Sequence, residues 1–113
     1  MTAKLAALAN QQIQDIWLYT ERRWGEAQAT EYVTGLFDFF ETLPFEQHLW
    51  RAVPRSSLRG ALYASYREHI VFFRHLSNDN LGILSVLHQR QDIPHDLNDI
   101  NERFSKLIFY VFN

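Results

Sequence analysis

The strongest structural signal in this chain is HIVFFRHLSNDNLGILSVLHQRQDIPHDL, residues 69–97. It contains two apolar segments, residues 69–74 and 81–87, separated by the polar run SNDN at residues 77–80. Two strand-forming segments joined by a short polar loop predict a β-hairpin. We therefore expect a hairpin here, with the rest of the chain arranged around it.

Both faces of the expected hairpin are apolar. Successive side chains of a strand point to opposite faces, so Ile70 and Phe72 lie on one face and Val71 and Phe73 on the other. An antiparallel sheet with one face in water alternates apolar and polar residues, and this segment does not. We expect the rest of this small chain to cover one face and a partner to cover the other.

Two segments with helical spacing precede the hairpin. The first is expected from Asn10, a residue favoured at N-caps, to Trp24, and Gly25 accepts the left-handed conformation that ends helices. The second runs from residue 26 to residue 43 and ends before Pro44. We expect the two helices to form an antiparallel hairpin that covers one side of the sheet.

Three further segments complete the predicted fold. Residues 3–7 are a weak strand candidate, and residues 61–66 are a stronger one next to the hairpin. After Pro94, apolar residues recur at helical spacings from Leu97 to Val111, which predicts a C-terminal helix. The predicted fold class is α+β, with an N-terminal helical hairpin packed on a three- to four-stranded antiparallel sheet and an extra C-terminal helix.

Composition limits the class of protein. A chain of 113 residues with 47% apolar residues is long enough for one domain with its own core. It has no cysteine, which excludes disulfides and thiolate chemistry and suits a reducing compartment. No apolar run approaches the ~20 residues of a membrane span, and the first residues lack the apolar core of a secretory signal. We expect a cytoplasmic protein without a membrane partner.

Charge is distributed unevenly, although the formal net charge is only −2. Residues 1–50 carry seven acidic and three basic side chains, whereas residues 51–90 carry six arginines against two acidic residues. Such an arginine-rich half suits an acidic protein or RNA, and arginines that keep strand edges solvated explain it equally well. The arginines concerned are Arg51, Arg55, Arg59, Arg67, Arg74 and Arg90.

Motifs for catalysis or cofactor binding are weak. The five histidines include no helical His-x-x-x-His pair, so we predict no metal site. Ser85, His88 and Asp92 are the residue types of a hydrolytic triad, but no nucleophile turn or glycine-rich oxyanion loop accompanies them. The four glycines are scattered, so no phosphate-binding loop is present either. We expect no catalytic site, no metal and no cofactor.

Four segments, in this order, resemble a known family: DIWLYT at residues 15–20, RWG at 23–25, HIVFFR at 69–74 and VLHQRQDIP at 86–94. Together they resemble the ParE branch of the RelE/ParE toxin superfamily, the toxin halves of bacterial and plasmid toxin–antitoxin pairs. The resemblance implies a RelE/ParE-like toxin domain at residues 1–97 and a C-terminal helical extension at residues 98–113.

The resemblance also implies a function. ParE-like toxins bind DNA gyrase and trap it on cleaved DNA, and they carry no catalytic site of their own. The implied partners are gyrase and a cognate antitoxin that neutralises the toxin, without sequence-specific contact to nucleic acid. A homodimer or a hetero-oligomer with the antitoxin is left open.

The resemblance assigns site residues as well. The antitoxin is expected to contact the apolar face of the central strand and the arginine-rich half of the chain. The expected target-binding residues are Arg74, His88, Arg90 and Asp92, and the expected antitoxin-binding residues are Val71, Phe73, Arg59 and Arg67.

Two alternatives stay open: a ribosome-dependent messenger-RNA endonuclease on the same fold, and an inactive structural relative. An RNA endonuclease needs a general acid and base, together with cations around the phosphate. This chain has a pI of about 6.2 and only two lysines, Lys4 and Lys106, which suits ribosomal RNA poorly. We therefore prefer the non-enzymatic toxin.

Overall fold

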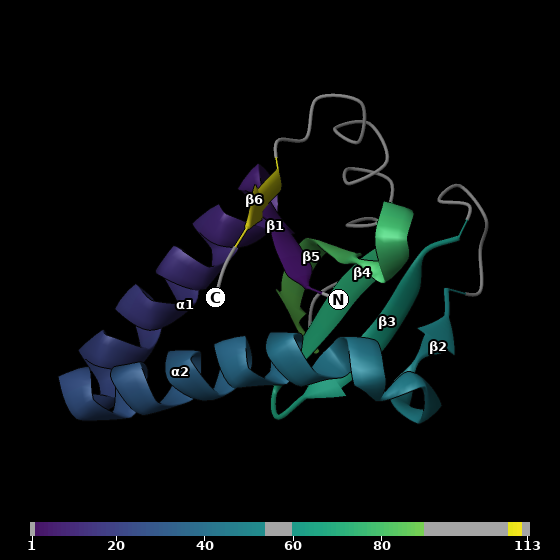
Figure 1. Cartoon of the computed structure of the whole chain (residues 1–113). Helices are drawn as coiled ribbons and strands as arrows, with labels where there is room; N and C mark the ends of the chain where they lie inside the picture. The colour runs from purple at the N-terminus through teal and green to yellow at the C-terminus, as the bar shows by residue number, and fades with distance from the viewer. Residues whose placement is uncertain (1, 54–59, 90–108, 112–113) are drawn as a thin grey trace.

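The structure is a computed structural model that describes residues 2–53, 60–89 and 109–111. In these residues two helices pack on a six-stranded sheet (Figure 1). Neither helix is long and apolar enough to cross a membrane. The elements are β1 (Ala3–Ala6), α1 (Ala7–Trp24), α2 (Glu26–Thr42), two 3₁₀ turns (Leu43–Phe45 and Gln47–Leu49), β2 (Arg51–Ala52), β3 (Leu62–Tyr66), β4 (His69–His75), a 3₁₀ turn (Ser77–Asp79), β5 (Leu81–His88) and β6 (Phe109–Val111).

The strand order of the sheet is β2-β3-β4-β5-β1-β6. The predicted hairpin is confirmed as β4 and β5, and β3 pairs with β4 as the third strand. The prediction of an all-antiparallel sheet of three or four strands is wrong. The sheet has six strands, and β1 runs parallel to β5, with Ala3 opposite Leu81. A parallel pair needs a long crossover connection, and here everything from α1 to β4 lies between the two strands.

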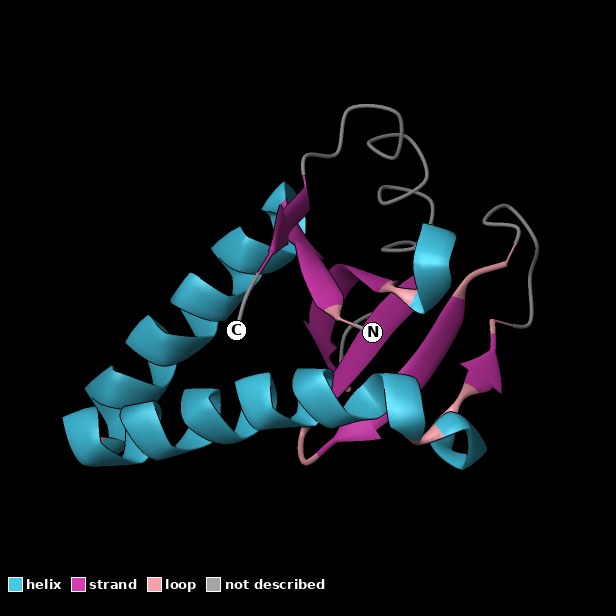
Figure 2. Ribbon diagram, in the orientation of Figure 1, coloured by secondary structure: helices cyan, strands magenta, loops and turns pink. Residues whose placement is uncertain are grey.

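The two predicted helices are confirmed, but they do not lie side by side as a closed hairpin. They diverge from their junction as a V over one face of the sheet (Figure 2). Gly25 forms the junction with a φ of 93°, and its backbone N–H donates to the carbonyl of Glu21 at 2.9 Å. The helix α1 begins at Ala7 and not at Asn10, because β1 continues into it directly and Ala6 is its N-cap.

The prediction of a C-terminal helix is wrong for the three residues of that segment that the structure describes. Phe109–Val111 is the strand β6, which pairs antiparallel with β1. A strand there satisfies backbone groups of β1 on the side that β5 leaves free, which the helical spacing of apolar residues could not reveal. The other residues of that predicted helix lie outside the described part of the chain.

The core occupies both faces of the sheet. On the helix-covered face Val71 and Phe73 have no exposed surface, and they pack with Leu36, Phe40 and other residues of the helices. On the opposite face Phe72, Leu84 and Leu87 are 1%, 1% and 4% exposed and form a second cluster. The expectation that a partner must cover this second face is therefore wrong for these three side chains, because the free chain already buries them.

One polar side chain holds α1 against β5. The strand β1 pairs with β5 only at residues 81–83, so the rest of β5 has no strand neighbour on that side within the described residues. There the carboxamide oxygen of Gln12 accepts hydrogen bonds from Ser85 Oγ at 2.9 Å and from the Val86 backbone N–H at 2.8 Å. Ser85 is fully buried, so Gln12 satisfies groups that water does not reach.

Removing the acceptor oxygen of Gln12 should destabilise the fold. We expect Gln12→Leu to lower the free energy of unfolding by about 2 kcal/mol, because two buried donors lose their partner. Gln12→Glu keeps an acceptor and should lose less. Gln14→Leu, at an exposed position of the same helix, is the matched control. Urea unfolding followed by circular dichroism measures the effect, and equal stability of the Gln12→Leu and Gln14→Leu variants would contradict it.

Candidate functional site

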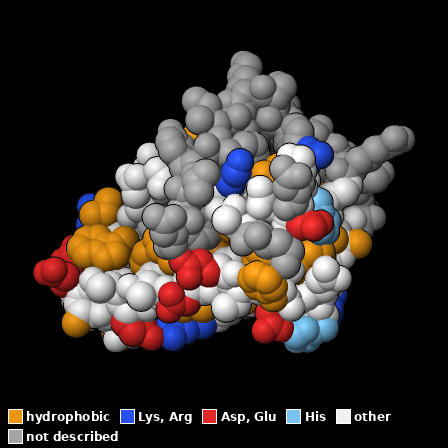
Figure 3. Space-filling view, in the orientation of Figure 1, with side chains coloured by type: hydrophobic (Ala, Val, Ile, Leu, Met, Phe, Trp, Pro, Cys, Tyr) orange, Lys and Arg blue, Asp and Glu red, His pale blue; other side chains and the backbone are white. Residues whose placement is uncertain are grey.

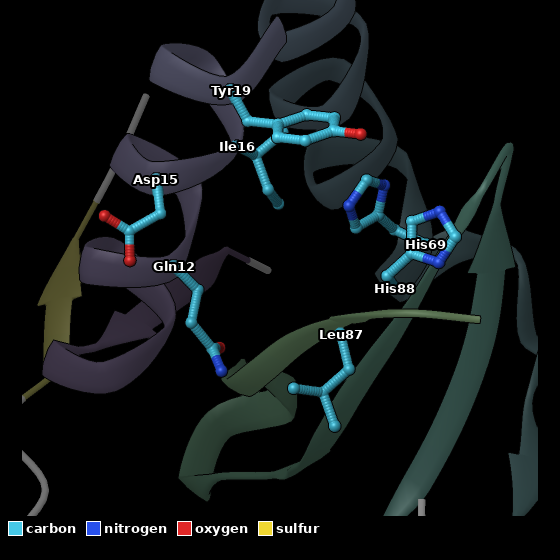
Figure 4. Close-up of a pocket in the computed structure, with 7 residues that line it drawn as sticks. All are labelled: Gln12, Asp15, Ile16, Tyr19, His69, Leu87 and His88. Atoms are coloured by element: carbon cyan, nitrogen blue, oxygen red, sulfur yellow. The ribbon is translucent and has the colours of Figure 1, made fainter. Parts of the chain in front are cut away.

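A cavity of about 270 Å³ opens between α1 and the adjoining ends of β4 and β5 (Figure 4). The strand β4 begins at His69 and β5 ends at His88, and the register of the hairpin places these two residues opposite each other. Their rings meet edge to face, with centroids 5.3 Å apart. The lining residues are Gln12, Asp15, Ile16, Tyr19, His69, Leu87 and His88.

The imidazole of His69 is held in one orientation by α2. The Nδ1 atom of His69 lies 2.6 Å from the hydroxyl of Tyr32. The ring of Tyr32 also meets the His69 ring edge to face, with the centroids 5.5 Å apart.

Burial keeps both members of this pair neutral at pH 7. Desolvation, reinforced by the neighbouring His88, lowers the pKa of His69 to about 4, although Glu68 opposes the shift. Desolvation also raises the pKa of Tyr32 to about 12. The inner wall of the cavity is therefore polar without being charged.

His88 lies nearer the surface than His69. Its Nε2 atom is 3.9 Å from a carboxylate oxygen of Glu68, an arrangement that is an ion pair only when His88 is protonated. The backbone N–H of Gln89 donates to the Glu68 carbonyl at 3.0 Å and ties the end of β5 to the turn before β4. The hairpin thus fixes the position of His88 at the mouth of the cavity.

The α1 side of the cavity contributes an aromatic ring and a carboxylate. The Tyr19 ring extends over the cavity towards the two histidines (Figure 4), and the guanidinium of Arg23 lies 5.0 Å from its centroid. Asp15 lies at the rim on an exposed part of α1, where Gln11 Nε2 donates to it at 3.2 Å. Among the described residues no cation forms an ion pair with Asp15.

Arg67 is engaged in an ion pair close to the cavity. Its guanidinium donates two hydrogen bonds to the Glu31 carboxylate, at 2.7 and 3.0 Å, and this lowers the pKa of Glu31. It also lies over the rings of Tyr32 and Tyr66, 5.3 and 5.4 Å from their centroids. Arg67 therefore links α2 to the turn between β3 and β4 in the free chain.

The predicted site residues do not form one cluster. Val71 and Phe73 are core residues beneath the helices, and their side chains do not reach the surface. Arg74 is half-buried on β4 and already has an interaction partner. Of the two expected target-binding residues that the structure describes, Arg74 and His88, only His88 lines the cavity. The remaining expected residues, Arg59, Arg90 and Asp92, lie outside the described part of the chain.

Sequence reasoning missed most of the cavity. The helical spacing of residues 10–24 assigns no role to Asp15 or Tyr19, and apart from the target contact expected of His88 the histidines were weighed only as metal ligands or in a hydrolytic triad. The pairing of His69 with His88 was accessible in principle, because the two residues lie at the outer ends of the predicted hairpin. Within the described residues, no three His, Cys, Asp or Glu side chains converge on a metal-sized site.

Burial of neutral His69 should make stability depend on pH. The unfolded chain takes up a proton at this imidazole near pH 6.5, and the folded chain takes it up only near pH 4. Stability present above pH 6.5 is therefore lost as the pH falls towards 4, by ~1 kcal/mol after allowance for partial exposure.

Denaturant titrations at several pH values test this expectation. The difference in unfolding free energy between the wild type and His69→Gln should shrink as the pH falls from 6.5 to 4. His48→Gln, at an exposed histidine, is the control and should leave the pH profile unchanged. A wild-type profile parallel to that of His69→Gln would show that His69 does not titrate as described.

Comparison with known proteins gives a family. A sequence model described as the ParE toxin of the type II toxin–antitoxin system parDE matches residues 3–93. Toxin ParE1 of Caulobacter vibrioides is 34% identical over 91 residues, which are 76% of this chain and 86% of the relative. Toxin ParE1 of Mycobacterium tuberculosis is 29% identical over 94 residues, which are 82% of this chain and 94% of the relative. The chain therefore belongs to the ParE toxin family of type II toxin–antitoxin systems.

Proposed function

We propose that this chain inhibits DNA gyrase by binding to it, and that a cognate antitoxin neutralises it by binding to the toxin surface. The observation that carries the proposal is the family match over residues 3–93, which spans both helices and strands β1 to β5. Membership of a toxin–antitoxin family implies an antitoxin partner. Gyrase as the target follows from the ParE branch of the superfamily.

The charge of the cavity supports binding over RNA cleavage. A ribonuclease must hold a phosphate with cations while a base and an acid move protons. Among the described residues that line the cavity there is no lysine or arginine, and the carboxylate of Asp15 repels phosphate. The nearby cation Arg67 is neutralised by Glu31. An RNA substrate would thus meet an unfavourable electrostatic environment at this cavity.

Exposed apolar side chains support a polypeptide partner. On the second half of α1, Leu18, Tyr19 and Trp24 are 44%, 59% and 68% exposed. Large exposed apolar side chains are candidates for contact with a partner. This part of α1 runs to the tip of the V, where α1 meets α2 (Figure 1). A toxin that is covered by its antitoxin needs such a surface in the free state.

We assign gyrase contact to Arg74, His88, Arg90 and Asp92, as the family motif suggests. His88 supports this assignment because it lies at the mouth of the cavity with a side chain that is 34% exposed. A contact by Phe73 or Val71 to the antitoxin would require their side chains to leave the core. Substitution of either residue would therefore act first on folding, and neither is a suitable probe of binding.

Purified protein tests the proposal in two parallel assays. Gyrase supercoiling should fall as the chain is added, with accumulation of cleaved DNA, because a bound toxin stalls the enzyme on its substrate. Messenger RNA on translating ribosomes should stay intact in the same preparation. Cut RNA with normal supercoiling would replace the proposal with the endonuclease alternative. Normal supercoiling together with intact messenger RNA would identify an inactive relative.

A further inference from the structure

The cavity between α1 and the histidine pair is small for a pocket that binds a free ligand. Pockets that hold small-molecule ligands usually measure roughly 300 to 1,000 Å³, and this one is about 270 Å³. It is also open to the surface along α1 (Figure 4). A projecting side chain of a bound polypeptide fits these dimensions better than a cofactor does.

The walls of the cavity suit a long side chain with a flat polar end. Ile16 provides aliphatic surface for a methylene stem. The Tyr19 ring and the imidazoles of His69 and His88 provide flat faces and edges. Asp15 supplies a carboxylate at the rim, and among the described residues it has no cationic partner.

The electrostatic environment selects a cation. Among the described residues no lysine or arginine lines the cavity, while Arg23 lies over the outer part of the Tyr19 wall. His69 stays neutral because it is buried against Tyr32. The two helices carry six carboxylates and only two arginines, and Figure 3 shows several carboxylates on the face of the molecule that α2 covers. One of those carboxylates, Glu31, is already neutralised by Arg67. An acidic guest would be repelled, and a basic guest is attracted.

We propose that this cavity is a socket for one arginine side chain of the antitoxin, an inference that rests on the function proposed above. The methylene stem lies against Ile16, and the guanidinium reaches Asp15 at the rim, whose carboxylate turns inward from the position drawn in Figure 4. Arginine fits better than lysine, because its planar guanidinium can stack on aromatic rings while it donates a pair of hydrogen bonds to a carboxylate. The socket explains why an aromatic ring and two imidazoles border the cavity with a carboxylate at its rim, while no lysine or arginine lines it among the described residues.

The probe for this socket is Nα-acetyl-arginine methylamide, titrated into the isotope-labelled full chain and followed by ¹H–¹⁵N NMR. We expect saturable shifts at the cavity residues with a dissociation constant on the order of millimolar. The citrulline derivative has nearly the same shape without the charge, and the glutamate derivative has the opposite charge. Both should bind at least fivefold more weakly. Equal binding of arginine and citrulline, or arginine shifts confined to other surfaces, would overturn the socket.

Matched variants separate the socket from general electrostatics. Asp15→Asn should weaken arginine binding about fivefold, the upper range for an exposed ion pair. Asp38→Asn removes one exposed carboxylate from α2, away from the cavity, and should leave the affinity unchanged. Equal losses in the two variants would mean that net charge, and not the socket, attracts the probe.

The purified toxin–antitoxin complex tests whether the antitoxin is what occupies the socket. In the complex the antitoxin fills the socket, so the arginine probe should cause no shifts at His69 or His88. A probe that still binds there would overturn the assignment of the antitoxin as the occupant. The gyrase assay is independent of both results. If the chain inhibits gyrase but does not prefer arginine, only the proposal of the socket is contradicted. If it prefers arginine but does not inhibit gyrase, only the proposal that gyrase is the target is contradicted.

Discussion

The hydrogen bonds from Ser85 and Val86 to Gln12 fix where α1 lies on the sheet. The partner strand β1 leaves β5 after residue 83, and a helix side chain takes over the role of the missing strand. Once Gln12 is fixed, positions three, four and seven residues further along α1 share its face. These positions are Asp15, Ile16 and Tyr19, so one buried polar contact sets the α1 wall of the cavity.

The opposite wall depends on the hairpin and on α2. The register of β4 and β5 sets His69 against His88, and the hydroxyl of Tyr32 on α2 fixes the His69 ring. The ion pair between Arg67 and Glu31 binds the same helix to the turn before β4. The V of the two helices is therefore attached to the end of the hairpin on both sides of the cavity. The site is a product of packing and hydrogen bonding, and not of a local sequence motif.

The sequence allowed the central elements to be predicted because their signals are local. The apolar runs on either side of SNDN predict the hairpin, and the break at Gly25 predicts two helices. The parallel pairing of β1 with β5 has no local signal, because Ala3 and Leu81 are distant in the chain. Gln12 looks like any surface glutamine on a helix until β5 is placed beside it. The burial of Val71 and Phe73 beneath the helices could not be read from the sequence either, because apolar residues of a strand look alike whether helices or a partner cover them.

A protein that inhibits gyrase by binding and one that inactivates it by catalysis differ in the time course of inhibition. This time course tests the proposed function most directly. Gyrase is incubated with the purified chain at several ratios below and above equality, and supercoiling is read at successive times. We expect inhibition to reach a plateau set by the ratio of toxin to gyrase and then to stay constant. Inhibition that keeps growing with time at substoichiometric toxin would contradict the account, because only turnover lets one molecule inactivate many.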